Sequence, residues 1–130
     1  MHPVVEEISS LTKVPILDLT GATTMSQLTS LLKRCDLLIS NDSGPVHLAS
    51  GVGTPVVAIF TRNQPGINPQ RWRPLAPNSR VVSVPSNETL SFAKAKTIDP
   101  KYLELISPQE VFEVVISALN LPAARPFNLP

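Results

Sequence analysis

The chain has 130 residues, 42% of them hydrophobic and 16% charged, which is typical of one globular domain with a buried core. Its formal net charge of +1 gives no reason to expect a nucleic-acid partner, and its single cysteine, Cys35, excludes a disulfide framework and a cysteine-rich zinc site. No apolar run approaches the ~20 residues of a membrane span and no signal peptide follows Met1, so a cytoplasmic location is expected.

The first predicted elements are a helix and a short strand. Apolar side chains recur at helical spacing after Pro3, which suits a first turn; they are Val4, Val5, Ile8 and Leu11. The residues Ile-Leu-Asp-Leu over 16–19 then predict a short strand, closed by Thr20-Gly21.

A second helix is predicted over 24–35, because Thr24 and Gln27 have the spacing of a capping box. Its apolar positions share one face of the helix and are Met25, Leu28, Leu31, Leu32 and Cys35. We therefore expect Cys35 to be a small core residue.

The central stretch, residues 37–60, alternates in a way that predicts a parallel βαβ unit. An apolar run over 37–39 stops at a polar turn over 40–45, a helical pattern covers 46–52, and a second apolar run begins at Val56. The turn would lie at the carboxyl end of its strand and the amino end of its helix, where open α/β sheets bind ligands. A helix amino terminus favours an anion.

The second half of the chain is rich in proline and is expected to hold long loops. Residues 61–79 lack periodicity, 80–84 predict another strand, and 85–106 are irregular. A serine cap followed by proline and glutamate predicts a final amphipathic helix over 107–119, and the tail over 123–130 is expected to be disordered. This alternation of helices and strands favours an α/β fold with a mostly parallel sheet.

Polar chemistry concentrates at Asp42, Ser43, Gly44 and His47, around the amino end of the central helix. Gly44 has no Cβ, so a ligand can approach the backbone closely. Ser43 and the first helical N–H groups can donate to phosphate, and His47, about one turn further on, can donate to a phosphate or a sugar hydroxyl. Asp42 can accept from a hydroxyl. The spacing leaves a purely structural interpretation open, in which Asp42 and Ser43 only cap the helix and His47 is a surface histidine.

Three catalytic alternatives fit this turn less well. Asp42-Ser43-Gly44 matches the Asp-Ser/Thr-Gly of aspartic proteases, but those are all-β dimers and this chain has helices. A serine hydrolase would have glycine two residues before Ser43, where Asn41 stands. Asp42, His47 and His2 show no metal-ligand spacing, so no metal site is expected.

The loop over 61–79 carries three arginines, Arg62, Arg71 and Arg73, and the only tryptophan of the chain, Trp72. The arginines can steer an anionic acceptor or a diphosphate, although loop cations are more often simply solvated. Trp72 is interpreted as a loop anchor rather than as a stacking platform.

Two linked motifs resemble glycosyltransferase family 9, which includes the heptosyltransferases of lipopolysaccharide assembly. One is Asp18-Leu19-Thr20-Gly21 before an amphipathic helix, and the other is SNDSGPVHLASGVGTPVVAIF over 40–60. The similarity runs from Leu17 to Phe60 and continues weakly to Leu119.

The resemblance implies a donor-binding, Rossmann-like domain over residues 1–122, part of the carboxyl-terminal half of a GT-B enzyme. By motif position, four residues would contact the diphosphate and sugar of an ADP-heptose-like donor, and Thr23 would lie near the nucleoside; the four are Asp42, Ser43, Gly44 and His47. Such enzymes rely on no bound metal to hold the diphosphate, so the helix and its side chains would stabilise the leaving group, and no cofactor is expected. The acceptor would be a lipopolysaccharide core or other surface glycan, met in the cytoplasm or at the inner membrane.

The chain also departs from the family, whose members are much longer. We expect the acceptor domain with its catalytic base, the first two donor-domain strands and a phosphate-binding lysine to be missing. A gap would then open in the sheet beside the strand at 16–19. A changed strand order, strands borrowed from another copy by self-association, or the rest of a larger molecule would close it. The loop over 62–74 is also longer and more polar than the family pattern.

The expected function is the donor-binding portion of a bacterial glycosyltransferase that is inactive as an isolated fragment. The alternative from another functional class is a non-catalytic nucleotide-binding or assembly module of the same fold. A third interpretation is a fragment without ligand affinity.

Overall fold

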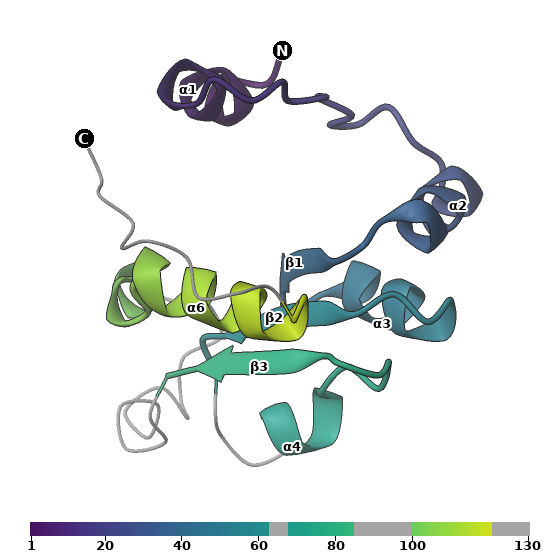
Figure 1. The fold of residues 1–130 in the computed structure, drawn as a ribbon, viewed down its shortest axis with the longest axis vertical. Helices are drawn as coiled ribbons and strands as arrows, with labels where there is room; N and C mark the ends of the chain where they lie inside the picture. Colours follow the sequence, from purple (N-terminus) through teal and green to yellow (C-terminus); the bar gives the residue numbers. More distant parts are fainter. Residues whose placement is uncertain (63–67, 85–99, 121–130) are drawn as a thin grey trace.

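The computed structural model describes residues 1–62, 68–84 and 100–120 of the chain. Residues 85–99 of the segment predicted to be irregular over 85–106, and the predicted disordered tail over 123–130, lie outside the described residues. The remainder of the segment predicted to be irregular contains a 3-10 helix over Pro100–Leu105. Figure 1 shows the arrangement of the described elements around one small sheet.

The sheet has three parallel strands in the order β1-β2-β3, which confirms the predicted α/β class (Figure 1). Leu38 pairs with Val56 across the first ladder, and Val57 pairs with Arg80 across the second. Because neighbouring strands are parallel, their carboxyl ends meet at one edge of the sheet. The strand bounds are β1 (Leu38–Asn41), β2 (Val56–Phe60) and β3 (Arg80–Ser83).

Helices α2 (Met25–Arg34) and α3 (Gly44–Gly51) cover one face of the sheet. Alternate side chains of the central strand β2 reach this layer, because successive side chains of a strand point to opposite faces. The buried residues of this layer are Leu32, Val46, Ala49, Val56, Ala58 and Phe60. The position of α3 between two parallel strands therefore follows the predicted βαβ unit.

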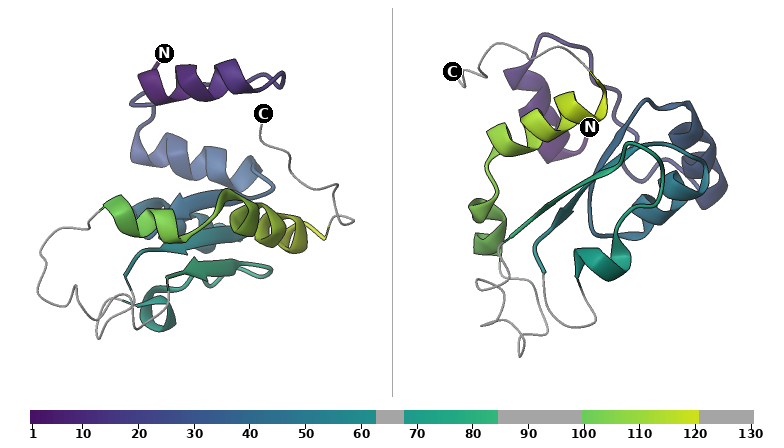
Figure 2. Two further views of the ribbon diagram at one scale, coloured as in Figure 1. Left: turned by 90° about the vertical axis from the view of Figure 1, so that its left-hand side faces the viewer. Right: turned by 60° about the horizontal axis from the view of Figure 1, so that its bottom comes forward.

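Helix α6 (Pro108–Ala118) covers the opposite face of the sheet, preceded by the 3-10 helix η2 (Pro100–Leu105). Its buried contacts are made with the other side chains of β2 and β3; the cluster is Val57, Val82, Val84, Ile106 and Ala118. The sheet is thus a middle layer between helices, as the two further views show (Figure 2).

Both predicted caps are confirmed. The Thr24 hydroxyl accepts the Gln27 N–H at 3.2 Å while the Gln27 side chain accepts the Thr24 N–H at 2.9 Å. The Ser107 hydroxyl accepts the Glu110 N–H at 3.1 Å, with Pro108 at the first helical position. Both caps provide acceptors for backbone N–H groups in the first turn, which have no partner within the helix.

The strand predicted over 16–19 is wrong: this segment forms no strand, and Leu17 is 78% exposed. A strand requires a neighbour for its backbone hydrogen bonds, and none of the described strands pairs with this segment. Instead the Asp18 carboxylate accepts the backbone N–H groups of His2 at 2.7 Å and Thr20 at 2.9 Å. Hydrogen bonds from the Thr20 side chain and from both backbone groups lower the pKa of Asp18 to about 2.

The interpretation of Cys35 as a core residue is also wrong. The helix ends at Arg34, so Cys35 is its C-cap, is exposed, and donates its thiol to the Leu31 carbonyl at 3.4 Å. Only part of the predicted apolar face is used: Leu32 is buried and Leu28 packs against the same cluster, whereas Met25 is exposed.

Two short helices lie outside the core. Helix α1 (Pro3–Leu11), which was predicted, has no buried residue and lies apart from the sheet (Figures 1 and 2). Helix α4 (Pro69–Trp72), which was not predicted, begins where the Asn68 side chain accepts the Arg71 N–H at 3.0 Å. Across the described residues, no helix is both long and apolar enough to cross a membrane.

Candidate functional site

The polar turn between β1 and α3 lies at the carboxyl edge of the sheet, as predicted. The Asp42 N–H donates to the Ile59 carbonyl at 3.1 Å, which fixes the turn against β2. Ser43 occupies the N-cap position but forms no side-chain cap; its hydroxyl donates to the Asn41 carbonyl at 3.1 Å and lies 3.2 Å from the Ser40 hydroxyl. The Ser43 hydroxyl therefore leaves the helix N–H groups available.

The start of α3 presents backbone donors to solvent. Pro45 has no N–H, and the Val46 N–H donates to the Ser43 carbonyl at 3.1 Å. For the N–H groups of Ser43 and Gly44, no acceptor exists among the described residues. A Cβ built at Gly44 would meet no protein atom within 4 Å, so the space above this backbone is open. A ligand can reach these donors directly.

Asp42 and Arg62 follow the ends of the neighbouring strands β1 and β2, so both lie at this edge. Partial burial of the carboxyl group raises the pKa of Asp42 above its usual value, while the positive charges of His47 and Arg62 oppose that shift. Burial prevails, so the folded protein favours the neutral acid more than an unfolded chain does.

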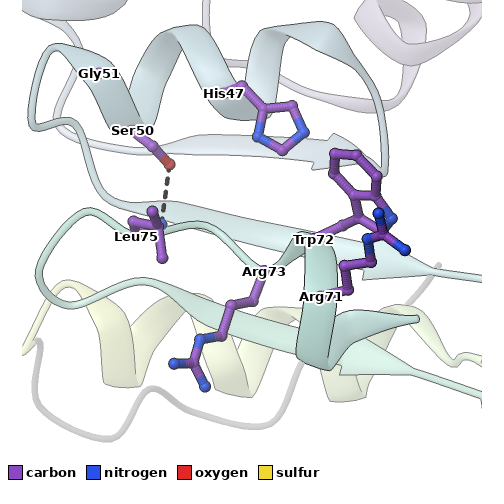
Figure 3. A pocket seen from close by; sticks show the side chains of 7 residues that line it. All are labelled: His47, Ser50, Gly51, Arg71, Trp72, Arg73 and Leu75. Carbon is purple, nitrogen blue, oxygen red and sulfur yellow. Dashed lines mark hydrogen bonds between the residues drawn. The ribbon is translucent and has the colours of Figure 1, made fainter. Parts of the chain in front are cut away.

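His47 lies one turn into α3 and faces helix α4. Its imidazole meets the Trp72 indole edge to face, with ring centroids 5.9 Å apart and an interplanar angle of 65°. The Arg71 guanidinium lies 5.3 Å from the centroid of the same indole. The three side chains border a cavity of about 430 Å³ (Figure 3). Its other lining residues are Ser50, Gly51, Arg73 and Leu75.

Thr23 is the one predicted site residue outside this turn. It is half-buried and immediately precedes Thr24, the N-cap of α2, and no hydrogen bond or ring contact joins it to the β1–α3 turn in the part of the chain that is described. Asp42, Ser43, Gly44 and His47 are brought together as one continuous segment, and a role for Thr23 beside a nucleoside stays a prediction.

The sequence did not predict which residue Trp72 would contact. It is 41% exposed and its ring meets that of His47 on α3, so it packs on the surface of the domain, as expected for a loop anchor. The Asn68-Pro69 pair, a cap followed by proline, is a signal that could have predicted α4. No local signal could have placed Trp72 beside His47, because the two residues are far apart in sequence.

Among the described residues, no cluster of three or more His, Cys, Asp or Glu side chains could hold a metal ion.

Comparison with known proteins gives a consistent set of similarities. The profile of glycosyltransferase family 9 (heptosyltransferase) matches residues 2–102, which is more than half of the chain. The lipopolysaccharide core heptosyltransferase OpsX of Haemophilus influenzae is 38% identical over 81 residues, covering 62% of this chain and 22% of that protein. Lipopolysaccharide heptosyltransferase 2 of Salmonella typhimurium is 30% identical over 105 residues, covering 79% of this chain and 29% of that protein.

Lipopolysaccharide heptosyltransferase 2 of Escherichia coli is 32% identical over 65 residues, which cover 50% of this chain and 18% of that protein. The chain thus spans less than a third of the length of each of these relatives. No solved structure matches the chain significantly.

Proposed function

Because the chain belongs to glycosyltransferase family 9, the heptosyltransferase family, we propose that its β1–α3 turn binds the diphosphate of a nucleotide-activated sugar. The observation that carries this proposal is the open amino terminus of α3, where the N–H groups of Ser43 and Gly44 have no acceptor among the described residues and a Cβ on Gly44 would meet no protein atom within 4 Å. A diphosphate accepts from such groups and is favoured by the positive end of the helix dipole.

The side chains of the turn supply the remaining donor contacts. His47 donates to a diphosphate or sugar oxygen one turn along α3, and Asp42 pairs with a sugar hydroxyl. Thr23 contributes on the nucleoside side. The relatives are named as heptosyltransferases acting in lipopolysaccharide or its core, which supports an ADP-heptose-like donor and a lipopolysaccharide-core or similar glycan acceptor. That reaction would take place on the cytoplasmic side of the inner membrane.

The transfer is a displacement at the anomeric carbon of the donor sugar. An acceptor oxygen forms the new bond to this carbon while the bond to the diphosphate oxygen breaks, and the electron pair leaves with the diphosphate. The donors at the start of α3 stabilise this developing charge. The acceptor proton passes to a base that we place outside these 130 residues, so we expect the chain to bind donor without catalysing transfer.

The test uses two glycines at opposite ends of α3. Gly44→Ala places a methyl group in the space proposed for the diphosphate, where it meets no protein atom. Gly51→Ala is the matched control, since a Cβ there also meets nothing within 4 Å. We expect isothermal titration calorimetry to show ADP binding weakened about tenfold or more by Gly44→Ala, from loss of charge-assisted bonds, and unchanged by Gly51→Ala.

Equal ADP affinity of the two variants and the unmodified chain would contradict the proposal. Circular dichroism checks that both variants keep their helices. A second titration compares ADP with an ADP-sugar: a donor site binds the ADP-sugar more tightly, whereas a non-catalytic nucleotide-binding module does not distinguish the sugar.

A further inference from the structure

The cavity between α3 and α4 lies beyond the place proposed for the diphosphate. His47 stands at the end nearest Gly44, whereas Ser50 lies about 9 Å from Gly44 along the helix axis, at 1.5 Å per residue. Figure 3 shows His47 and Ser50 on the α3 side of the cavity and Trp72 and Leu75 on the α4 side. Its volume of about 430 Å³ falls within the range of small-molecule sites.

Hydrogen bonds and buried residues fix the α4 side of this cavity to the rest of the domain. The Leu75 N–H donates to the Ser50 hydroxyl at 3.2 Å, which ties this segment to α3. Pro74 and Ala76, on either side of Leu75, are buried. Asn68 caps α4. The cavity is therefore formed before any ligand arrives, which lowers the cost of binding.

The lining combines apolar surface with positive charge. Trp72 is 41% exposed and Leu75 is 80% exposed, and both line the cavity (Figure 3). Arg71 and Arg73 flank Trp72 in sequence, and neither forms an ion pair with a carboxylate in the described part of the chain. Such a lining suits a ligand that carries both apolar surface and negative charge.

We propose that this cavity is a second ligand site, which takes an anionic sugar while the diphosphate occupies the start of α3. The C–H groups of a pyranose ring pack against indole because they are electropositive and the aromatic face is electronegative. The anionic group pairs with the guanidinium of Arg71 or Arg73.

This inference rests on the proposed function only in one respect: the ligand in the neighbouring site is taken to be the diphosphate of the donor. If the start of α3 holds the donor diphosphate, we assign a sugar bound in the neighbouring cavity to the acceptor. The site would therefore let residues of this chain hold part of the acceptor as well as the donor.

The test exploits the fact that Trp72 is the only tryptophan of the chain, so tryptophan fluorescence reports on the surroundings of this one residue. The probe is glucose 6-phosphate, with glucose and inorganic phosphate as comparisons. We expect a saturable fluorescence change with glucose 6-phosphate and much weaker responses to either comparison, because only the sugar phosphate uses both the indole and the guanidinium groups.

Two variants and a control test which guanidinium group binds the anionic group of the ligand. Arg71→Gln and Arg73→Gln remove one guanidinium each, and we expect at least one of them to weaken glucose 6-phosphate binding about tenfold. Arg34→Gln removes an exposed arginine from the end of α2 and is the matched control, with unchanged affinity. All three positions are exposed, so folding is not at risk.

The last arm repeats the titration in saturating ADP, with amide shifts of Ser43 and Gly44 reporting the nucleotide. Unchanged glucose 6-phosphate affinity supports a separate site, and displacement by ADP overturns it. A failure of both arginine variants to weaken binding, or no fluorescence response at all, also overturns it. A Trp72 response without any ADP shift at Ser43 or Gly44 would instead overturn the proposed donor site and leave the cavity assignment intact.

Discussion

At the scale of single residues, the environment of the β1–α3 turn changes the pKa of Asp42 and the direction of the Ser43 hydroxyl. Asp42 is partly withdrawn from water by burial and lies near the positive charges of His47 and Arg62. The Ser43 hydroxyl is directed back to the strand, which leaves the helix start open. These residues were predictable because they are contiguous, so one local pattern places all of them.

Asp42→Asn is expected to stabilise the fold modestly at neutral pH. The folded-state pKa of Asp42 is raised, so ionisation of this group destabilises the folded state as pH rises through that pKa. Asparagine carries no such charge. Thermal unfolding followed by circular dichroism should therefore show a higher Tm for Asp42→Asn at pH 7 and a difference that vanishes below pH 3.8, the usual pKa of the group.

An Asp42→Asn variant less stable than the unmodified chain at pH 7 would show that the charge interactions with His47 and Arg62 outweigh burial. The matched control is Asp36→Asn, an exposed aspartate beyond the end of α2, which should change the Tm little at either pH.

Thr54 is the only buried polar residue in the described core, and its hydroxyl donates to the Leu32 carbonyl at 2.6 Å. Thr54→Val keeps the shape and removes this bond, while the Leu32 carbonyl still accepts the Cys35 N–H at 3.1 Å. We therefore expect a cost of about 1 kcal/mol in the free energy of unfolding. Chemical denaturation measures this loss. Thr29→Val, which removes a local bond to the Met25 carbonyl, should stay within about 0.5 kcal/mol, and equal losses would contradict the account.

At the scale of elements, capping residues and apolar periodicity predicted the helices well. The same local patterns predicted a strand correctly only where a neighbouring strand pairs with it. The caps at Thr24 and Ser107 act within a few residues, so sequence alone locates α2 and α6. The segment over 16–19 has strand-like residues, but pairing is non-local and no described strand receives it. Helix α4 was missed because four residues give no periodicity.

Helix α1 forms but does not pack on the core. Ile8 is 49% exposed on α1, whereas Val114 of α6 packs against the buried cluster beneath it. We expect Ile8→Ser to change the free energy of unfolding by less than about 0.5 kcal/mol and Val114→Ser by more than about 1 kcal/mol. Urea denaturation of both variants makes the comparison; a loss for Ile8→Ser as large as that for Val114→Ser would mean that α1 belongs to the core.

At the scale of the whole molecule, the sheet predicts contact between copies of the chain. Strand β1 is an edge strand of the described sheet, so its outer backbone groups have no strand partner among the described residues, and its Ile39 is 50% exposed. We expect sedimentation equilibrium to show concentration-dependent association.

The control for this association uses two lysine substitutions at similarly exposed apolar positions. Ile39→Lys puts a charge on the open edge and should weaken association, whereas Leu105→Lys, at a position 49% exposed on η2, should not. A chain that stays monomeric at all concentrations would contradict the prediction.

The architecture also limits what sequence could reveal about the site. The strand-turn-helix was visible because it is continuous, and the family profile covers it. The cavity beside it depends on α3 and α4 meeting through His47 and Trp72, which only the folded chain shows. Tertiary contacts of this kind have no signature in local periodicity.

The central claim is that the start of α3 binds the diphosphate of a sugar donor, and a titration of the chain with ADP and with ADP-sugars, followed by amide NMR shifts, tests it most directly. The account predicts the largest shifts at Ser43, Gly44 and His47, stronger for an ADP-sugar than for ADP, and none along α6. Shifts centred elsewhere, or no shift at these three residues, would contradict it.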